Sequence, residues 1–169
     1  MKPTCPKRVL GVALTLVNSN DHCHECPSPE EALDVAITQA RNGGLRRTSA
    51  LKAVLSAIIS TPAPVTLAEL CEHPKLSGSC DKATVYRLLT RLHEKRILRK
   101  IGLHDRSARF VLQHGDHHHD YLVCTECGSI EVLEIACPVE ALEKEVSKRS
   151  GSRGIYHELE FFGLCPTCA

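Results

Sequence analysis

The stretch DKATVYRLLTRLHEKR, residues 81–96, decides the fold of the first half of this 169-residue chain. Asp81 suits the start of a helix because its side-chain oxygen can accept a hydrogen bond from the first turn. The apolar residues that follow recur at i, i+3, i+4 and i+7, the period of one helical face: Val85, Leu88, Leu89 and Leu92. The segment therefore predicts an amphipathic helix with its apolar face in a core.

The opposite face of this helix is polar and basic, with Lys82, Thr84, Tyr86, Arg87, Thr90, Arg91 and Lys95. Residues 81–100 hold seven Lys+Arg against two acidic residues. A solvated face commonly mixes both signs in i,i+4 pairs, so the one-sided excess favours contact with phosphates. The alternative is a plain helical bundle whose basic face only keeps it soluble.

Helical patterns also precede this segment, over residues 28–42, 48–60 and 66–71. Two strand-like segments follow it, over residues 97–101 and 109–113, with a polar turn between them. Helices followed by a two-stranded hairpin predict a winged helix-turn-helix domain. Its basic helix would enter the major groove of double-stranded DNA.

The net charge of +1 hides two unequal halves. Residues 1–113 carry +7 and residues 114–169 carry −6, which predicts nucleic acid on one side only. With 43% hydrophobic and 24% charged residues, a disordered or fibrous protein is excluded. No apolar run approaches the ~18 residues of a membrane span, so we expect no membrane association and a cytoplasmic location.

The second half predicts a small α/β unit. Strands are expected at 121–124, 129–135 and 155–162, and a helix at 139–150 with Leu142 and Val146 facing inward. The three strands would form an antiparallel meander, and a second copy would cover its edge, giving a homodimer. The predicted fold class is α+β, with a winged-helix domain at 29–113 and a dimerisation domain at 114–169. Residues 1–28 are predicted to be a disordered leader, or to be present only because the start codon was assigned too early.

Two C-x-x-C pairs lie far apart in the acidic half, Cys124 with Cys127 and Cys165 with Cys168. This spacing lets both thiolates of a pair reach one tetrahedral Zn²⁺. Disulfide bonds do not require cysteines two residues apart, so the spacing favours zinc over disulfides. A site with four thiolates has no open position, so its zinc would be structural.

A second cluster reads His117, His118, His119 and Asp120. In an extended segment His118 and Asp120 share one side. Glu140 and His157 are the distant residues that could complete a site suited to Zn²⁺, Fe²⁺ or Mn²⁺. The alternatives are an adventitious surface chelate, a helix-dipole partner for Glu140 and an ordinary strand histidine for His157.

Three ordered motifs carry a resemblance: ATVYR at 83–87, HHHDYLVCTECG at 117–128 and CPTC at 165–168. Together they resemble the ferric uptake regulator family of metal-dependent bacterial repressors, over residues 30–169. The resemblance implies operator binding by the winged helix and dimerisation by the second domain, with metal setting the angle between the DNA-binding heads.

The resemblance also implies roles for single residues. Tyr86 and Arg87 match recognition-helix positions, beside Thr84 and Lys82, and Arg46 matches a residue that reaches the minor groove. The structural zinc ligands would be the four cysteines of the two pairs, and the second metal site would be His118, Asp120, Glu140 and His157.

The family's hinge sensor site is only partly matched. Pro64, Val111 and Tyr121 stand where three of its ligands would be, and only His119 agrees. Either His104, Asp105, His114 or His117 substitutes from the wing, or regulation relies on the His118 site.

The sequence thus predicts a non-enzymatic, metal-responsive repressor of metal-uptake or metal-homeostasis genes, with zinc as the favoured signal. Iron and peroxide sensing are alternatives within the same family. Alternatives of another class are a thiol oxidoreductase, a zinc hydrolase and a zinc store without DNA binding.

Overall fold

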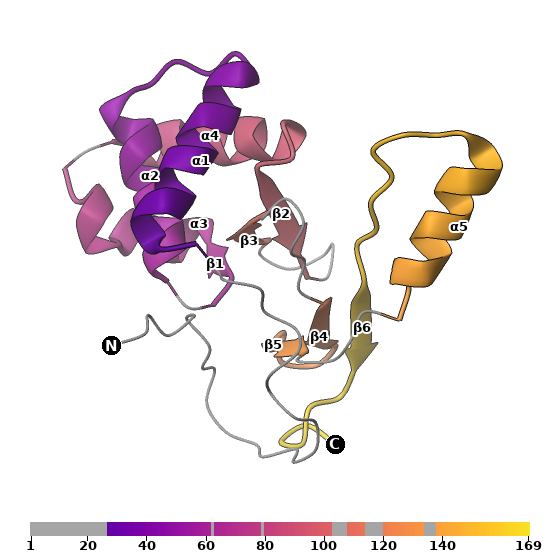
Figure 1. Cartoon of the computed structure of the whole chain (residues 1–169). Coiled ribbons are helices and arrows are strands. Elements are labelled where there is room, and N and C mark those ends of the chain that lie inside the picture. Colours follow the sequence, from indigo (N-terminus) through magenta and orange to yellow (C-terminus); the bar gives the residue numbers. More distant parts are fainter. Residues whose placement is uncertain (1–26, 62, 79, 103–107, 114–119, 134–137) are drawn as a thin grey trace. The chain divides into compact units, whose positions relative to one another are not determined.

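The computed structural model describes residues 27–61, 63–78, 80–102, 108–113, 120–133 and 138–169. These residues divide into two compact units, one up to residue 113 and one from residue 120 onward. Figure 1 shows the helices and strands of both. The predicted leader lies almost wholly outside the described residues. The predicted boundary between 113 and 114 borders undescribed residues and stays a prediction.

The described residues of the first unit form four α-helices and one 3-10 helix. They are α1 (Pro29–Asn42), α2 (Ser49–Ser60), α3 (Leu67–Glu72), η1 (Pro74–Leu76) and α4 (Lys82–Glu94). Each α-helix begins at a side-chain cap that accepts a backbone N–H of its first turn: Ser28, Thr48, Thr66 and Asp81. The helices predicted from capping and periodicity are confirmed.

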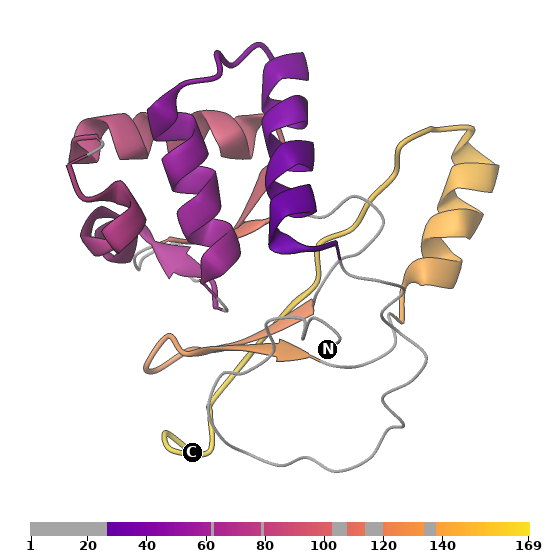
Figure 2. The same ribbon diagram turned by 60° about the vertical axis from the view of Figure 1, so that its left-hand side comes forward.

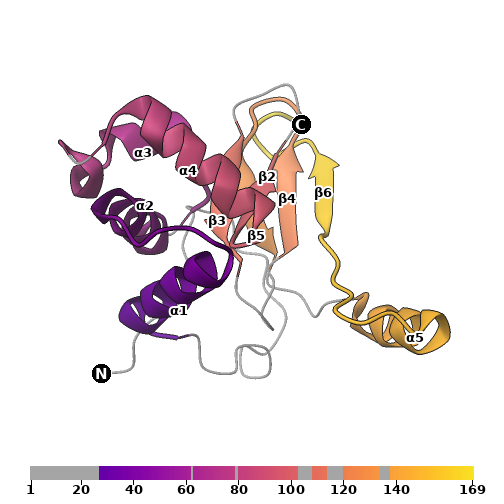
Figure 3. The ribbon, with the colours of Figure 1, turned by 90° about the horizontal axis from the view of Figure 1, so that it is seen from above.

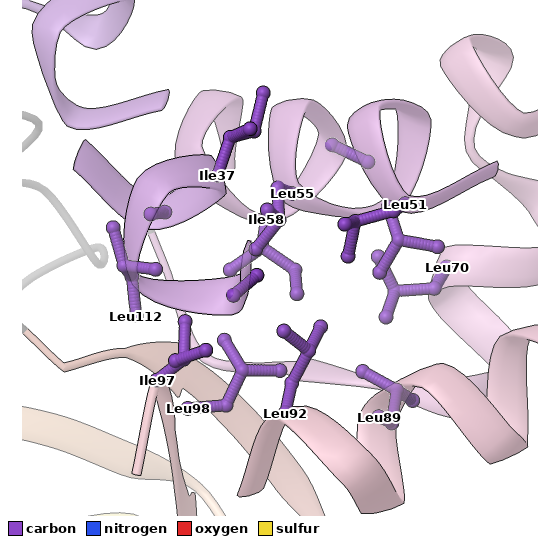
Figure 4. Packing of buried hydrophobic residues seen from close by; sticks show 14 of the residues in the cluster. Ile37, Leu51, Leu55, Ile58, Leu70, Leu89, Leu92, Ile97, Leu98 and Leu112 are labelled. Carbon is purple, nitrogen blue, oxygen red and sulfur yellow. The ribbon is translucent and has the colours of Figure 1, made fainter. Parts of the chain in front are cut away.

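One hydrophobic core holds this unit together. Leu51 and Leu55 of α2 are buried against Leu89 and Leu92 of α4, with Leu70 of α3 beside them (Figure 4). Leu98 and Leu112 of the wing strands, and Ile97 just before the first of them, complete the core (Figure 4). The apolar face of α4 is therefore fixed inward, and its polar face must point to solvent.

The wing is a three-stranded antiparallel sheet in the order β1-β3-β2, formed by β1 (Val65–Thr66), β2 (Leu98–Ile101) and β3 (Arg109–Leu112). The predicted hairpin is confirmed, with Leu98 opposite Leu112. Strand β1 was not predicted, because it has only two residues, the second of which caps α3, and two residues give no periodic signal.

Where it is described, the second unit has a three-stranded sheet in the order β5-β4-β6 and one helix, α5 (Glu140–Ser150). Strands β4 (Asp120–Cys124) and β5 (Ile130–Leu133) form an antiparallel hairpin, visible in Figure 2. Strand β6 (Glu160–Gly163) runs parallel to β4, as Figure 3 shows. The predicted antiparallel meander is wrong, because the connection through α5 is long enough to return the chain in the direction of β4.

Two further expectations for this unit are wrong. The strand predicted over 155–162 is ordered only as β6, because the parallel ladder begins where Tyr121 faces Glu160, so His157 precedes the strand. Leu142 and Val146 do not face inward, and their exposed fractions are 55% and 42%. Nothing in the described part of the chain covers this apolar face of α5.

The chain is an α+β protein with an N-terminal winged helix and a C-terminal α/β unit, as predicted. Among the described helices, none combines the length and the apolar composition that crossing a membrane requires.

Candidate nucleic-acid interface and metal centre

Helix α4 presents a basic, exposed face. Tyr86 has an exposed fraction of 59%, and Lys82, Arg87 and Arg91 are also exposed, while Val85 on the opposite face is buried. Arg87 Nη2 donates to Thr84 Oγ1 at 3.4 Å, which directs the guanidinium along the helix surface. Cations around an exposed aromatic ring suit contact with phosphates and bases.

The N-terminus of α4 is fixed by Asp81, whose Oδ1 accepts from the Thr84 backbone N–H at 2.6 Å. The hydrogen bonds with Thr84 hold the pKa of the Asp81 carboxyl below its ordinary value. The cap is thus a charged group at neutral pH, where the helix dipole favours a negative charge.

Contacts between α3 and the wing position the rest of this surface. Arg109 Nη1 donates to the Pro64 carbonyl at 3.0 Å and to Glu69 Oε2 at 3.2 Å. Burial raises the pKa of Glu69, but hydrogen bonds from Thr66 and the charge of Arg109 outweigh it and leave that pKa lowered. Arg46 lies exposed between α1 and α2, after Gly44, whose φ of +84° ends α1.

The four paired cysteines converge in the second unit. Cys124 ends β4, and its ladder partner Gly163 ends β6, so the loops that carry the other three cysteines leave the same end of two parallel strands. Thr125 N–H donates to the Gly163 carbonyl at 2.8 Å, which holds the two loops together. The predicted four-cysteine group is brought together.

The sulfur positions fit a tetrahedral metal ion. Four sulfurs at about 2.3 Å from one zinc lie about 3.8 Å from one another. Cys127 Sγ and Cys165 Sγ are 3.8 Å apart, and all four sulfurs lie within 4.8 Å of one another. None of the six cysteines in the described segments forms a disulfide.

The thiols of this cluster differ in acidity. Backbone N–H groups of Cys127 and Cys165 stabilise the Cys124 thiolate and lower its pKa to about 6. The Thr167 hydroxyl lowers the pKa of Cys165, whereas hydrogen bonds with the Cys165 and Cys127 side chains raise the pKa of Cys168 to about 12. Loss of a proton from Cys124 is therefore easy, and loss of a proton from Cys168 is opposed. A bound divalent cation would allow all four thiols to ionise together.

The predicted second metal site is described only in part. Asp120, at the start of β4, has an exposed fraction of 4%, and its Oδ1 has no hydrogen-bond partner among the described residues. His157 Nδ1 lies 3.2 Å from Glu143 Oε2. His118 lies outside the described residues, and Glu140 is described only as the first residue of α5. A buried carboxylate oxygen without a donor fits a cation ligand.

The family model for the ferric uptake regulator family matches residues 42–162, which is more than half of the chain. The chain belongs to the ferric uptake regulator family. It is 38% identical over 87 residues to the ferric uptake regulation protein of Neisseria meningitidis serogroup A, covering 51% of this chain and 58% of that relative. The chain thus spans little more than half the length of that relative.

A longer match is to the peroxide-responsive repressor PerR of Staphylococcus saprophyticus, 27% identical over 150 residues, covering 85% of this chain and 96% of that protein. The solved ferric uptake regulator of Vibrio cholerae is similar with a TM-score of 0.55 at 28% identity, covering 76% of this chain and 98% of that one. The Helicobacter pylori Fur structure, with a TM-score of 0.63 at 22% identity, covers 84% and 94% and supports the fold.

The resemblance places three positions of a hinge sensor site at Pro64, Val111 and Tyr121. Pro64 and Tyr121 are buried, and Val111 is half-buried in β3. The side chains of proline and valine carry no donor atom for a metal. The candidate sensor residues His104, His117 and His119 lie outside the described residues, as do Asp105 and His114.

Sequence reasoning missed Glu143. Its carboxylate contacts a predicted ligand, His157, from the same helix that Glu140 begins. The signal was available, because Glu143 follows Glu140 by three residues and an i,i+3 pair shares one helical face.

Proposed function

We propose that this protein is a metal-responsive, DNA-binding transcriptional repressor of metal-uptake or metal-homeostasis genes. The observation that carries the proposal is the exposed basic face of α4 on a winged-helix unit, in a chain that also gathers four cysteine sulfurs within 4.8 Å. One feature suits DNA and the other suits a metal ion. Membership of a family of regulators supports joining the two.

In the DNA complex, α4 lies in the major groove. Tyr86 and Arg87 contact bases and backbone, Lys82 and Thr84 contact the adjoining phosphates, and Arg46 reaches the minor groove. The cap at Asp81 and the buried Val85 hold the helix in place, so little ordering is needed on binding.

Cys124, Cys127, Cys165 and Cys168 hold a structural zinc, and His118, Asp120, Glu140 and His157 hold the second divalent metal. Zinc cross-links the loops after β4 and β6, and so stabilises the second unit. The buried and unpartnered Oδ1 of Asp120 supports its assignment as a ligand.

Sensing rests on a population shift, in which metal binds one arrangement of the two units better than the other. Zinc is the signal we favour, because imidazole and carboxylate donors accept it readily at low concentration. Iron or peroxide sensing is the second candidate, supported by the match with a peroxide-responsive repressor over 85% of this chain. In either case His119 and the wing histidines His104 and His117 are the sensor candidates.

The protein acts as a cytoplasmic homodimer. Phe161 and Phe162 of the edge strand β6 are 41% and 52% exposed, and Leu142 and Val146 of α5 add further apolar surface. Large apolar side chains left exposed on two elements of one unit are typical of an association site. A second copy would cover it and supply the two-fold symmetry of an operator with two half-sites.

The test is operator binding by the purified protein with its four-cysteine zinc retained and each metal restored in turn. We expect tight binding only with the sensing metal, and loss of that binding in Arg87→Ala. Arg149→Ala, which removes an exposed arginine of α5, is the matched control and should bind as the wild type. Equal DNA affinity with and without added metal would refute metal sensing.

A thiol oxidoreductase is the alternative from another class, and the lowered pKa of Cys124 is the observation that favours it. Against it, Cys124 is only 2% exposed, so a disulfide substrate cannot reach its sulfur. Turnover of a disulfide substrate by the metal-free protein would favour the enzyme. Weak, salt-insensitive DNA binding that ignores sequence would instead favour a zinc store.

A further inference from the structure

Two hydroxyl groups lie against sulfurs of the four-cysteine group, one from each of its loops. Cys127 Sγ is 3.3 Å from Ser129 Oγ, and Cys165 Sγ is 3.1 Å from Thr167 Oγ1. In both loops the hydroxyl belongs to the second residue after the cysteine. The sulfurs of Cys127 and Cys165 are themselves 3.8 Å apart. Hydroxyls from two separate loops therefore contact two adjacent sulfurs.

Backbone hydrogen bonds hold both hydroxyl-bearing residues in place. The Cys124 N–H donates to the Ser129 carbonyl at 2.9 Å, which closes the first loop onto the end of β4. In the second loop the Cys168 N–H donates to the Cys165 carbonyl at 2.9 Å, and the turn that this bond closes includes Thr167. Each hydroxyl is thus positioned by the loop that carries its cysteine.

A bound metal decides the direction of these hydrogen bonds. A cysteine sulfur that ligates zinc has lost its proton, so it can only accept. A serine or threonine hydroxyl can donate or accept, and it rotates to suit its partner. In the zinc-loaded protein the hydroxyls of Ser129 and Thr167 must therefore be the donors. Hydrogen bonds to a charged acceptor are stronger than those between neutral groups.

The charge and exposure of the cysteine group give these donors a use. Four thiolates outweigh the charge of one Zn²⁺ and leave the site anionic. A hydrogen bond withdraws electron density from sulfur, and a less basic thiolate is a weaker nucleophile. Cys127 is the exposed member of the group, whereas Cys124 is buried and the other two are half-buried. The thiolate most open to dissolved reagents is therefore one that a hydroxyl contacts.

We propose that Ser129 and Thr167 are positioning residues of the four-cysteine zinc site, with hydroxyls that donate to the metal-bound thiolates of Cys127 and Cys165. The inference rests on the proposed structural zinc and adds two residues that do not ligate it. These donors strengthen zinc binding and slow attack on Cys127. The structural zinc is thereby retained while the sensing metal binds and dissociates.

The experiment uses the full chain with Co²⁺ in place of the structural zinc, because thiolate-to-cobalt charge-transfer bands report the electron density on sulfur. Ser129→Ala and Thr167→Val each remove one hydroxyl. We expect both to shift these bands to longer wavelength, because a thiolate without a donor releases its electron more easily. Competition with a chromophoric chelator should show zinc binding weakened about 2- to 10-fold in each variant.

Reactivity of the exposed thiolate gives a second readout. In the zinc-loaded protein, alkylation of Cys127 by iodoacetamide, followed by peptide mass spectrometry, should be faster in Ser129→Ala than in the wild type. Ser129→Thr and Thr167→Ser keep a hydroxyl at each position. These two variants should restore the wild-type bands, zinc affinity and alkylation rate.

The matched control is Thr125→Val in the first loop. The Thr125 hydroxyl donates to the Gly163 carbonyl at 3.4 Å, not to a sulfur, and the variant keeps the backbone hydrogen bond between the same two residues. Its charge-transfer bands and its alkylation rate should be those of the wild type.

Wild-type bands in Ser129→Ala or in Thr167→Val would overturn the role of that residue and leave the zinc site intact. Equal shifts in Ser129→Thr and Thr167→Ser would also overturn it, because the change would then not follow from the hydroxyl. Equal alkylation rates in the wild type and Ser129→Ala would overturn the slowed attack on Cys127. A wild-type protein without thiolate-to-cobalt bands would refute the four-cysteine site itself, and both roles with it.

Discussion

The two units differ in how they bury apolar side chains. In the first, four helices and the wing share one continuous core, and residues such as Leu55, Leu70 and Leu92 have no exposed surface. Among the described residues of the second, few apolar side chains are buried, and large ones are exposed: Leu142, Val146, Phe161, Phe162 and Leu164. The first unit can fold on its own core, whereas the second needs help from outside its chain.

A unit of about 50 residues rarely holds itself together by burial alone, and small domains commonly add a metal or a partner. In the second unit the cysteine cluster could bind a metal, and the exposed strand β6 could bind a partner. The unit proposed to respond to metal is therefore the one whose stability depends most on metal. A unit that is proposed to bind DNA and has its own core, joined to a unit whose folding is expected to depend on metal, suits a switch.

Removing the zinc should give the largest effect. Structural zinc contributes on the order of 10–16 kcal/mol of apparent binding free energy at neutral pH. Cys127→Ser, or a strong chelator, should therefore unfold the second unit and leave the first folded. Amide NMR spectra would show loss of the dispersed Val123 signal with the Leu92 signal retained. Simultaneous loss of both signals would contradict the proposed difference between the units, because it would show that the first unit does not stay folded on its own core.

The converse change is Leu92→Ala in the core of the first unit. Leu92 is fully buried, so the cavity should cost about 2–5 kcal/mol of unfolding free energy. Denaturant titration of the zinc-loaded protein would measure it, and zinc content should not change. Val35→Ala, at a position 53% exposed on α1, is the control and should stay within about 0.5 kcal/mol of the wild type.

Association should depend on the second unit alone. Phe162→Glu places a charge on β6 and should forfeit about 0.8–1.5 kcal/mol of burial per protomer, half the value for a fully exposed side chain, because Phe162 is 52% exposed. This loss shifts the dimer toward monomer. Sedimentation velocity over a concentration series would measure the shift. Val35→Glu changes an equally exposed residue of the first unit and should leave the dimer unaffected. A monomeric wild type would reject the proposed interface.

Features with a local physical cause were predictable from the sequence. The cap at Asp81, the buried face of α4 and the convergence of the cysteines all follow from spacings within a short stretch or from the geometry of one ion. The parallel pairing of β6 was not predictable in this way, because it depends on how α5 returns the chain. The exposure of Leu142 was missed for a related reason. An apolar residue on an amphipathic helix predicts a buried face, but nothing in the described part of the chain packs against it.

The smallest expected effect concerns acid. The pKa of Asp81 is lowered from 3.8 in the folded protein, so its contribution to stability is complete above that value and is lost as the pH falls through the folded pKa. Asp81→Asn keeps a neutral cap and removes this titration. Between pH 5 and pH 2 the Tm of the first unit should therefore fall less steeply in this variant, by a margin below the effect of Leu92→Ala. Asp34→Asn, at an exposed position of α1, serves as the control and should keep the wild-type slope. Equal slopes in all three proteins would show that Asp81 does not carry a charge that stabilises α4.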